Sequence, residues 1–334
     1  MTTPPRNAKR ESVPSALLKR FPQVRVLLVG DLLADHYLYG QTERVSREAP
    51  VLIVRHEREE LKLGGGANAA ANARALGAKV SAIGVIGRDD FGRQMSALFK
   101  ASGITLRAVA SAVTETRTRV LAGGLSTTRQ QMLRIDRGVV GPLPPKVRAS
   151  LAVQVLAAGR QADVVMVSDY GAGVLCEETR AALRAIAAEG IPVCVDSRFG
   201  LSDFSGLTVC KPNEPELAAY TGLPIGNDVE LLAAGKAAQK RLDCQVLLVT
   251  RGRKGMTLFE RGEKPIHLPV YGSEEAVDVT GAGDTVSATF ALALGAGGRP
   301  FEAARLANIA GALVVQKQGT ATVSRPELAR ELSR

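Results

Sequence analysis

The sequence has few of the residues that build metal sites and aromatic cores. Among its 334 residues there is no tryptophan, and aromatic residues make up 4%. The three histidines, His36, His56 and His267, are scattered along the chain, so we predict no zinc site. Alanine, valine and leucine must therefore fill the core, and a content of 46% hydrophobic residues is enough for a sizeable one.

Cysteine is scarce as well. The four cysteines, Cys176, Cys194, Cys210 and Cys244, lie far apart and form no C-x-x-C pair. Two of them, Cys194 and Cys210, fall in segments that resemble strands. This pattern predicts reduced, mostly buried thiols and a cytoplasmic location, and it argues against a disulfide framework or a metal site.

Long apolar runs are absent. No run reaches ~18 residues, the length that a membrane-spanning helix needs. Residues 1–20 are polar and basic and contain no apolar stretch of signal-peptide length, so we expect a flexible N-terminal extension there. Residues 21–334 are then expected to form one large domain, with no membrane as a partner.

Positive charge is in excess, with a formal net charge of +10. Nucleic acid is one partner that such a charge suits, but the basic residues form no run of five and no aromatic residues are interleaved with them. Positive charge also steers polyanionic small molecules toward a protein. We therefore predict a small-molecule partner rather than nucleic acid, and a nucleic-acid binder remains the alternative.

A glycine-rich stretch, DVTGAGD, ends at Asp284 and precedes an apolar run, residues 286–294, that is typical of a buried helix. The first amides of a helix have no internal partner, and small residues let an anion approach them. Gly281, Ala282 and Gly283 would supply these amides beside the Asp284 carboxylate. This arrangement suits phosphoryl transfer, because the amides hold developing charge and the carboxylate deprotonates the attacking hydroxyl. The alternative is that Asp284 only stabilises the helix dipole.

The first strand is predicted over residues 24–29, which are apolar apart from Arg25 and are followed by Gly30 and Asp31. Such a run is typical of a central parallel strand that is buried on both faces. Side chains just after such strands line the crevice where α/β proteins bind ligands. Asp31 and Asp35 are therefore candidates to bind sugar hydroxyls, and the alternative is that both are ordinary loop aspartates.

Two segments, residues 38–60 and 105–136, differ from the crossover helices that an α/β chain normally has. The second contains alternating apolar and polar residues at 116–122 and 130–135, which indicates strands. We predict that the two inserts form a small separate sheet, a lid over the active site. Because such a sheet has exposed edges, we also predict that it pairs with a second subunit to form a homodimer.

Residues 64–69 open another helix after a glycine-rich turn. Their pattern matches the dinucleotide fingerprint G-x-G-x-x-A, and Asp89 and Asp90 follow about 20 residues later, as that motif requires. A dehydrogenase is therefore an alternative function. Against it, this turn is not the first strand-to-helix turn of the chain, and Asn68 suits a hydroxyl-rich ligand better than a pyrophosphate.

From residue 164 to 316, segments typical of strands and helices alternate. This alternation predicts an α/β fold with a mostly parallel central sheet and helices on both faces. We find no internal repeat and no low-complexity linker, so one main domain with a lid accounts for the chain.

Four stretches resemble the motifs of the ribokinase-like (PfkB) carbohydrate kinases. Gly64-Gly-Gly-Ala-Asn68 resembles the first motif and Asp278-Val-Thr-Gly-Ala-Gly-Asp284 the second. Lys211-Pro-Asn213-Glu-Pro-Glu216 resembles the Asn/Glu motif at the metal–ATP site, and Thr250-Arg-Gly-Arg-Lys-Gly255 the nucleotide-binding turn. Because they occur in the family's order and span nearly the whole chain, the resemblance implies a ribokinase-like fold and ATP with Mg²⁺ as cofactors.

The resemblance narrows to the heptose-7-phosphate kinases of lipopolysaccharide core synthesis. It rests on residues 30–40, 44–51, 131–136 and 168–171. The bifunctional relatives carry a nucleotidyltransferase domain with an H-x-G-H motif, which this sequence lacks, so the stand-alone kinases are the expected match. Relatives often have lysine where this chain has Ala172, so a lysine contact to phosphate is not expected there.

The implied reaction is phosphorylation of the anomeric hydroxyl of D-glycero-β-D-manno-heptose 7-phosphate by ATP, for the formation of ADP-heptose. The alternative is another sugar or sugar-phosphate kinase of the same family. The resemblance makes Asp284 the base, and the amides of Gly281, Ala282 and Gly283 the groups that stabilise the transferred phosphoryl group. The residues implied in binding the sugar phosphate are Asp31, Asp35, Gly65, Gly66, Asn68, Asp169, Arg134 and Lys211.

The implied ATP site comes from the second half of the chain. Asn213 and Glu216 are also expected to serve Mg²⁺, by indirect contact. The basic group that holds the substrate phosphate remains open among Lys211, Arg198, Arg134, Arg119 and Arg117. The residues implied in binding ATP are Asn213, Glu214, Glu216, Thr250, Gly252, Gly255 and Asn308.

Overall fold

The computed structural model describes residues 15–124, 129–139, 141–272 and 275–333. Residues 1–14 of the predicted N-terminal extension lie outside the described residues. The rest of that segment differs from the prediction, because Ser15–Arg20 form a helix, α1, that packs against α10 (Arg325–Leu332). Leu17 and Leu18 are buried in the core, which is the physical reason why this part is ordered.

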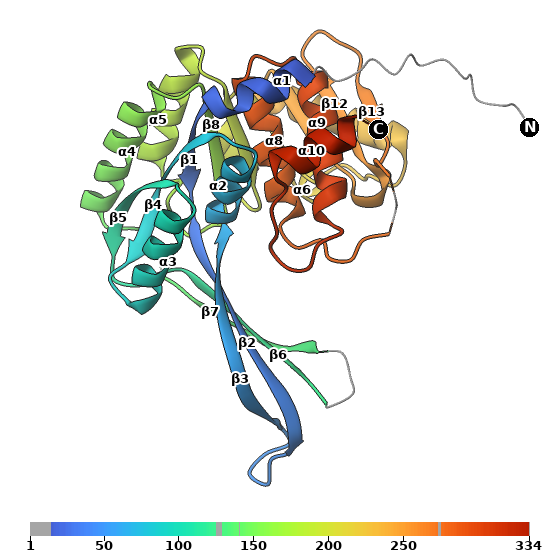
Figure 1. Cartoon of the computed structure of the whole chain (residues 1–334). Helices are drawn as coiled ribbons and strands as arrows, with labels where there is room; N and C mark the ends of the chain where they lie inside the picture. Colours follow the sequence, from blue (N-terminus) through green and yellow to red (C-terminus); the bar gives the residue numbers. More distant parts are fainter. Residues whose placement is uncertain (1–14, 125–128, 140, 273–274, 334) are drawn as a thin grey trace, which may run out of the picture.

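A large sheet forms the centre of the molecule, and nine strands of the described chain belong to it (Figure 1). The seven strands from β5 to β11 in this sheet run parallel, and β12 and β13 are antiparallel at one edge. This confirms the predicted mostly parallel α/β sheet. In spatial order the strands are β13 (Ile266–Leu268), β12 (Met256–Glu260), β11 (Val246–Thr250), β10 (Val209–Cys210), β9 (Val193–Ser197), β8 (Val164–Asp169), β1 (Arg25–Gly30), β4 (Lys79–Gly87) and β5 (Thr105–Ser111).

Helices cover both faces of this sheet, as predicted. Successive side chains of a strand point to opposite faces, so Val26 and Leu28 of β1 join one core cluster and Leu27 and Val29 the other. The first cluster packs under α2 (Gly66–Ala75), α3 (Asp90–Ala101), α8 (Ala282–Gly295) and α9 (Pro300–Val314). The second packs under α4 (Pro145–Gly159), α5 (Glu177–Ala188), α6 (Glu214–Thr221) and α7 (Asp228–Leu242).

Small side chains set the spacing between α2 and α8, two of the helices that cover the first core cluster. Ala67, Ala70 and Ala73 of α2 are completely buried, as are Ala288 and Ala291 of α8, which lies against α2. Helices that meet through alanine approach closely, so the short loops at their ends are brought together. The expectation that small aliphatic residues fill the core is thus confirmed, and the site described below lies at the start of these two helices.

A second sheet, the lid, projects from the body as a long twisted ribbon (Figure 1). It consists of β2 (Leu32–Val45), β3 (Leu52–Gly65), β6 (Thr116–Gly123) and β7 (Gln130–Arg137), in the spatial order β3-β2-β6-β7. The predicted separate sheet is confirmed, but its bounds differ from residues 38–60 and 105–136. Strands β2 and β3 extend into the body, where their ends are buried, and residues 105–111 form β5 of the large sheet.

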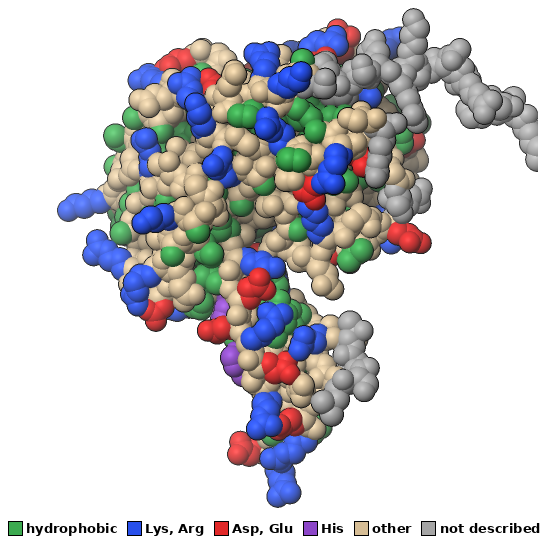
Figure 2. Space-filling view, in the orientation of Figure 1, with side chains coloured by type: hydrophobic (Ala, Val, Ile, Leu, Met, Phe, Trp, Pro, Cys, Tyr) green, Lys and Arg blue, Asp and Glu red, His purple; other side chains and the backbone are tan. Residues whose placement is uncertain are grey.

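Three further findings concern the cysteines, the helices and the charged surface of the described residues. Cys194, Cys210 and Cys244 are buried, Cys176 is partly buried, and all four are free thiols, as predicted. None of the described helices has the length and apolar character needed to cross a lipid bilayer. Lysine and arginine side chains are distributed over the visible face of the molecule rather than gathered in one patch (Figure 2).

Candidate active site

The start of α8 lies at the centre of the candidate site. Gly281 has a φ of 77°, in the left-handed region, and an added Cβ would lie 2.7 Å from Nδ2 of Asn68, so glycine is required there. Asp278 braces the preceding turn, because its carboxylate accepts hydrogen bonds from the amides of Thr280 and Gly319. Asp284 follows in the first helical turn and is 6% exposed.

A cleft of about 1180 Å³ opens in front of this helix start. It contains the residues that were predicted to bind ATP, together with residues 281–284, so the structure brings these distant segments into one space. Val277 and Val279 also line it, and both are more than 60% exposed, which leaves apolar surface for a flat ring to cover. The predicted ATP residues that line the cleft are Asn213, Glu214, Glu216, Thr250, Gly252, Gly255 and Asn308.

The Asn/Glu motif forms the start of α6. The Asn213 side chain accepts from the amide of Glu216 at 2.8 Å, and the Glu216 carboxylate accepts from the amide of Asn213 at 2.8 Å. This reciprocal capping box fixes both side chains at the wall of the cleft. Burial raises the pKa of Glu216, an effect that the amide of Asn213 and the charge of Lys211 oppose.

The side chains on the same wall of the cleft show whether Mg²⁺ fits the site. Asp196, Glu214 and Glu216 line the cleft, and carboxylate oxygen is the ligand that Mg²⁺ prefers. Among the described residues no group of three acidic, histidine or cysteine side chains is close enough to hold a metal alone. The residues therefore fit an ion that keeps several waters and is shared with substrate phosphates, as Mg²⁺ usually is.

The nucleotide turn follows β11. Gly252 and Gly255 have φ values of 56° and 84°, and an added Cβ at Gly255 would lie 2.1 Å from the carbonyl oxygen of Leu268. Arg251, which the sequence analysis did not single out, ties this turn to α6 and α7. Its guanidinium is buried and bonds Glu214 and Asp228, each at 2.7 Å. On the opposite wall, Asn308 of α9 donates to the carbonyl of Pro269 at 2.7 Å.

A smaller pocket of about 140 Å³ lies between the lid and α8. Asp35 and Gly65, both predicted to bind the sugar, line it. Asp35 is 5% exposed and pairs with Arg119 at 2.6 Å. Gly64 is required beside it, because a Cβ there would lie 2.5 Å from the Asp35 carboxylate. Four arginines complete the lining, namely Arg117, Arg119 and Arg134 of the lid and Arg198 after β9.

Asp31 and Asn68, which were also predicted to bind the sugar, are buried, do not line the smaller pocket and are hydrogen-bonded within the protein. The Asp31 carboxylate accepts from the amides of Tyr170, Ala172 and Val174, so its oxygens hold the turn after β8. Burial raises its pKa to about 6, although these amides lower it. Asn68 is 2% exposed and donates to the Asp284 carboxylate at 2.7 Å.

Three other predicted sugar-site residues also lie outside the smaller pocket. Gly66 is the first residue of α2, where its amide donates to the carbonyl of Asp31. Asp169 lines the large cleft and accepts from Ser197 at 2.7 Å. Lys211 lines the large cleft as well, beside Gly283.

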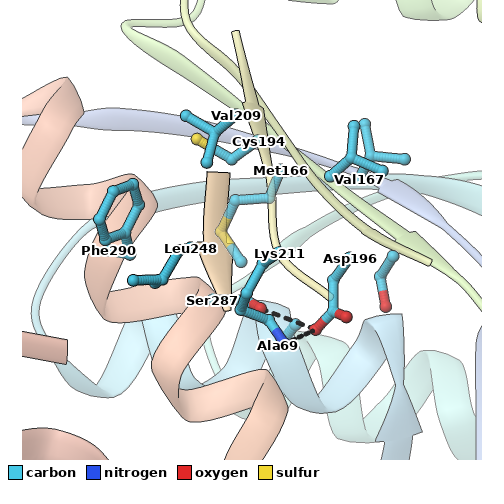
Figure 3. Close-up of a pocket in the computed structure, with 12 residues that line it drawn as sticks. Ala69, Met166, Val167, Cys194, Asp196, Val209, Lys211, Leu248, Ser287 and Phe290 are labelled. Carbon is cyan, nitrogen blue, oxygen red and sulfur yellow. Dashed lines mark hydrogen bonds and ion pairs between the residues drawn. The ribbon is translucent and has the colours of Figure 1, made fainter. Parts of the chain in front are cut away.

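Asp196 is a site residue that the sequence analysis missed. Lys211 pairs with its carboxylate at 3.0 Å, and Ser287 of α8 donates to the same oxygen at 2.7 Å (Figure 3). The signal was present, because Asp196 lies one residue before the end of β9, much as Asp169 ends β8 and Asp31 follows β1. Without the sheet order, nothing distinguished this strand end from the others.

The two spaces meet at Asp284. Tyr170, Arg198, Phe199, Gly281 and Asp284 line both of them. Burial and, to a smaller extent, the charge of Asp196 raise the pKa of Asp284 to about 7, while Asn68, Tyr170 and Lys211 lower it. A carboxylate with a pKa near 7 between a phosphate cleft and a sugar-sized pocket can accept a proton from a hydroxyl that attacks phosphorus.

Comparisons with known proteins agree with this geometry. The profile of the pfkB family carbohydrate kinases matches residues 24–328. A protein of Caulobacter sp. (strain K31) named "Bifunctional protein HldE" is 42% identical over 318 residues, which are 93% of this chain and 63% of that protein. The protein of the same name from Pseudomonas aeruginosa PAO1 is 40% identical over 320 residues, 95% of this chain and 65% of its own length. The chain thus spans less than two thirds of these relatives.

Solved structures share the fold. A ribokinase of Arabidopsis thaliana, complexed with ribose and ATP, has a TM-score of 0.73 and 24% identity, and covers 93% of this chain and 99% of its own. Phosphofructokinase-2 of Escherichia coli, in complex with substrates and products, has a TM-score of 0.76 and 20% identity, with coverages of 93% and 100%. The predicted ribokinase-like fold is therefore confirmed.

Proposed function

Since this chain belongs to the pfkB family of carbohydrate kinases, we propose that it transfers the γ-phosphoryl group of ATP to the anomeric hydroxyl of D-glycero-β-D-manno-heptose 7-phosphate. The dehydrogenase alternative is wrong, because the chain is a sugar kinase; its residues 64–69 form the end of β3, where Gly65 lines the smaller pocket, and the start of α2. The observation that carries the proposal is the position of Asp284 between a nucleotide-sized cleft and an arginine-lined pocket.

The arginines support a sugar phosphate as the acceptor. Arg119 pairs with Asp35, and Arg117 and Arg134 both pair with Asp136. Arg198 stacks on the Tyr170 ring at 4.9 Å and has no carboxylate partner in the described part of the chain. Guanidinium groups bind phosphate by paired, charge-assisted hydrogen bonds. The pocket therefore suits an acceptor that carries a phosphate at the end away from the reacting hydroxyl.

The proposed reaction follows from the positions of the chain's own groups. The acceptor hydroxyl lies against Asp284 and attacks the γ-phosphorus in line with the bond to ADP. A P–O bond to the sugar forms, the bond to the β-phosphate oxygen breaks, and Asp284 takes the hydroxyl proton. The amides of Gly281 and Gly283 face the charge that develops on the transferred group, whereas the amide of Ala282, which was also predicted to do so, donates to the carbonyl of Val279. Mg²⁺, when bound near Glu216 and Asn213, would neutralise the ATP phosphates.

The lid supports a homodimer as part of the proposal. Every residue of β7 is exposed, including the apolar Met132, Leu133 and Ile135, and so are Val51 and Leu52 at the far end of the lid hairpin. An exposed strand with apolar side chains is a surface for pairing with another chain. A second copy of the lid would cover these residues.

A panel of sugars with Mg-ATP tests the proposal. Heptose 7-phosphate, unphosphorylated heptose, ribose, fructose 6-phosphate and fructose 1-phosphate are each incubated with the protein, and ADP release is measured. We expect the highest kcat/KM with heptose 7-phosphate. A higher value with another sugar phosphate would favour the alternative, a different acceptor within the same family. Release of ADP at one rate whatever the sugar would contradict both.

A further inference from the structure

The Asp284 carboxylate is held between two hydrogen-bond donors from different parts of the chain. Asn68 of α2 donates from Nδ2 to Oδ2 at 2.7 Å, and Tyr170, after β8, donates from its hydroxyl to Oδ1 at 3.0 Å. Each donor bonds a different oxygen, so together they oppose rotation of the carboxylate about its last bond. A group that must meet an incoming hydroxyl at a fixed angle benefits from this restriction.

The Asn68 side chain is itself held in one orientation. Asn72, one turn later in α2, donates from Nδ2 to Oδ1 and to the carbonyl oxygen of Asn68, at 3.3 and 3.0 Å. Thr285 of α8 in turn donates to Oδ1 of Asn72 at 2.8 Å. Because Asn72 bonds the oxygen end of the Asn68 amide, the amino end is the one that points to Asp284. All these side chains are buried.

The second donor, Tyr170, is held in place through backbone amides of its own turn. Asp31 accepts the Tyr170 amide at 2.7 Å and the next but one amide, that of Ala172, at 3.0 Å. The guanidinium of Arg198 lies 4.9 Å above the ring. Burial and the charge of Asp284 raise the pKa of Tyr170 well above its usual value, so the hydroxyl keeps its proton and remains a donor. Asp31, which is too buried to contact a sugar, thus shapes the turn that carries this donor.

We propose that Tyr170 is a positioning residue of the kinase reaction, which together with Asn68 fixes the Asp284 carboxylate in the orientation needed to receive the proton of the acceptor hydroxyl. The proposal rests on the proposed function insofar as it assigns the hydroxyl to a sugar. Tyr170 lines both the cleft and the smaller, arginine-lined pocket, and among the residues that the structure describes its hydroxyl hydrogen-bonds no carboxylate other than that of Asp284.

The groups around Asp284 should set the pH dependence of the reaction. The groups that act on Asp284 are Asn68 from α2, Tyr170 after β8, Asp196 from β9 and Lys211 after β10. Hydrogen bonds from Asn68 and Tyr170 and the charge of Lys211 lower its pKa, whereas burial and Asp196 raise it. Only the deprotonated carboxylate accepts a proton, so kcat/KM should rise with pH through about 7.

The rise of kcat/KM with pH is the limb of the pH profile that reports on Asp284. Two substitutions at position 170 should shift this limb in opposite directions. Tyr170→Phe removes a donor to the charged carboxylate, so the limb should shift upward by about one pH unit, with kcat above the limb lowered about tenfold and the KM for ATP nearly unchanged. Incorporation of 3,5-difluorotyrosine at position 170 keeps the shape but makes the hydroxyl a stronger donor, so the limb should shift downward. Tyr220→Phe, a partly buried hydroxyl on α6, is the matched control and should change neither quantity.

A measurement that needs no substrate separates this proposal from the proposed function. Carbon-13 NMR of carboxyl-labelled aspartate, with the Asp284 signal assigned from the Asp284→Asn variant, gives the pKa directly. We expect a value near that of the kinetic limb, and the same opposite shifts in the two variants. An unshifted titration in both variants, together with wild-type kcat, would overturn the positioning role even if the protein is a kinase. Shifted titrations in a protein without kinase activity would refute the proposed kinase function but support the hydrogen bond between Tyr170 and Asp284.

Discussion

Strand β8 lies near the centre of the large sheet and all six of its residues are buried, whereas all eight residues of β7, at the edge of the lid, are exposed. The body holds its polar site residues in buried hydrogen bonds, as the contacts of Asp31, Asn68 and Asp284 show. The lid carries arginines in partly exposed ion pairs and apolar side chains without cover. This difference supports the proposal that the body fixes the reacting groups, while the lid contributes charge and a surface for a second subunit.

The largest expected effect comes from breaking the body's site. Asp284→Asn keeps the size of the side chain but cannot accept a proton. We expect kcat to fall by ~10²–10⁴-fold, which corresponds to about 3–5 kcal/mol, with ATP affinity little changed. Asp284→Ala should be at least as inactive. Steady-state kinetics and nucleotide titration of the variants measure this.

The matched control is Asp243→Asn, which neutralises an exposed carboxylate that pairs with Arg261. It should leave kcat unchanged. If Asp284 served only the helix dipole, its loss would cost ~0.3–1 kcal/mol of stability and turnover would be normal. Near-normal kcat in a slightly less stable Asp284→Asn protein would therefore show that Asp284 is not the base.

A second prediction tests whether the arginine pocket recognises phosphate. Arg198→Ala should lower kcat/KM for the sugar 7-phosphate by about 10–100-fold, because a hydrogen bond to a charged group is lost, and should hardly affect the unphosphorylated sugar. Arg107→Ala, on the exposed surface of β5, is the control that removes a charge from the edge strand. Equal kcat/KM for phosphorylated and unphosphorylated heptose in the wild-type protein would exclude a dedicated phosphate site.

A third prediction concerns the lid surface. Light scattering at micromolar concentration should give twice the chain mass of 35.2 kDa. The double substitution Leu133→Asp and Ile135→Asp places charges on β7 and should give the single chain mass with the body still folded. Val229→Asp, at an even more exposed apolar residue on α7, should leave the mass unchanged. A wild-type protein that is a clean monomer would contradict the pairing surface.

The smallest expected effect lies at the far end of the body, in α10. Burial alone would raise the pKa of Glu327, but hydrogen bonds from Lys317 and Ser324 outweigh it and lower the pKa to about 2. A lowered carboxyl pKa stabilises the fold above the unfolded value of 4.5, and this contribution is lost as the pH falls toward 2. Because the side chain is 31% exposed, we expect only about 1–2 kcal/mol.

Thermal unfolding of Glu327→Gln measures this contribution. The melting temperature of the variant should lie below that of the wild type at pH 7, and the difference should shrink as the pH approaches 2. Glu331→Gln in the same helix is a comparison for a general loss of charge. A difference between Glu327→Gln and wild type that is the same at pH 7 and pH 3 would mean that ionisation of Glu327 is not its cause.

The body of the fold was predictable from the sequence because local patterns decide it. A mostly apolar run predicted β1, the alternation over residues 164–316 predicted the parallel strands and helices of the second half, and glycine-rich turns predicted the starts of α2 and α8. Helix α4 was not predicted, because its apolar residues lie on several sides and no capping side chain marks its start. Strand β5 was assigned to the lid, since an edge strand alternates just as a lid strand does, and only its pairing with β4 reveals its sheet.

The site was predictable as a set of segments but not as a set of contacts. The glycine-rich cradle, the Asn/Glu motif and the nucleotide turn do line one cleft. The different surroundings of Asp31 and Asp35 were not predictable, because both follow β1 and only the lid hairpin decides that Asp35 is the one that lines the smaller pocket. Asn68 was assigned to the sugar because nothing in the sequence shows that α2 and α8 start side by side.

We propose that the chain phosphorylates a sugar phosphate at its anomeric hydroxyl, with Asp284 as the base. The most direct test is phosphorus NMR of a reaction that contains heptose 7-phosphate, Mg-ATP and either the wild-type protein or Asp284→Asn. With the wild type, we predict a new phosphate resonance coupled to the anomeric proton that grows in step with ADP, and with the variant only its slow appearance. Formation of ADP without a sugar bisphosphate, or a new phosphate on another carbon, would contradict the account.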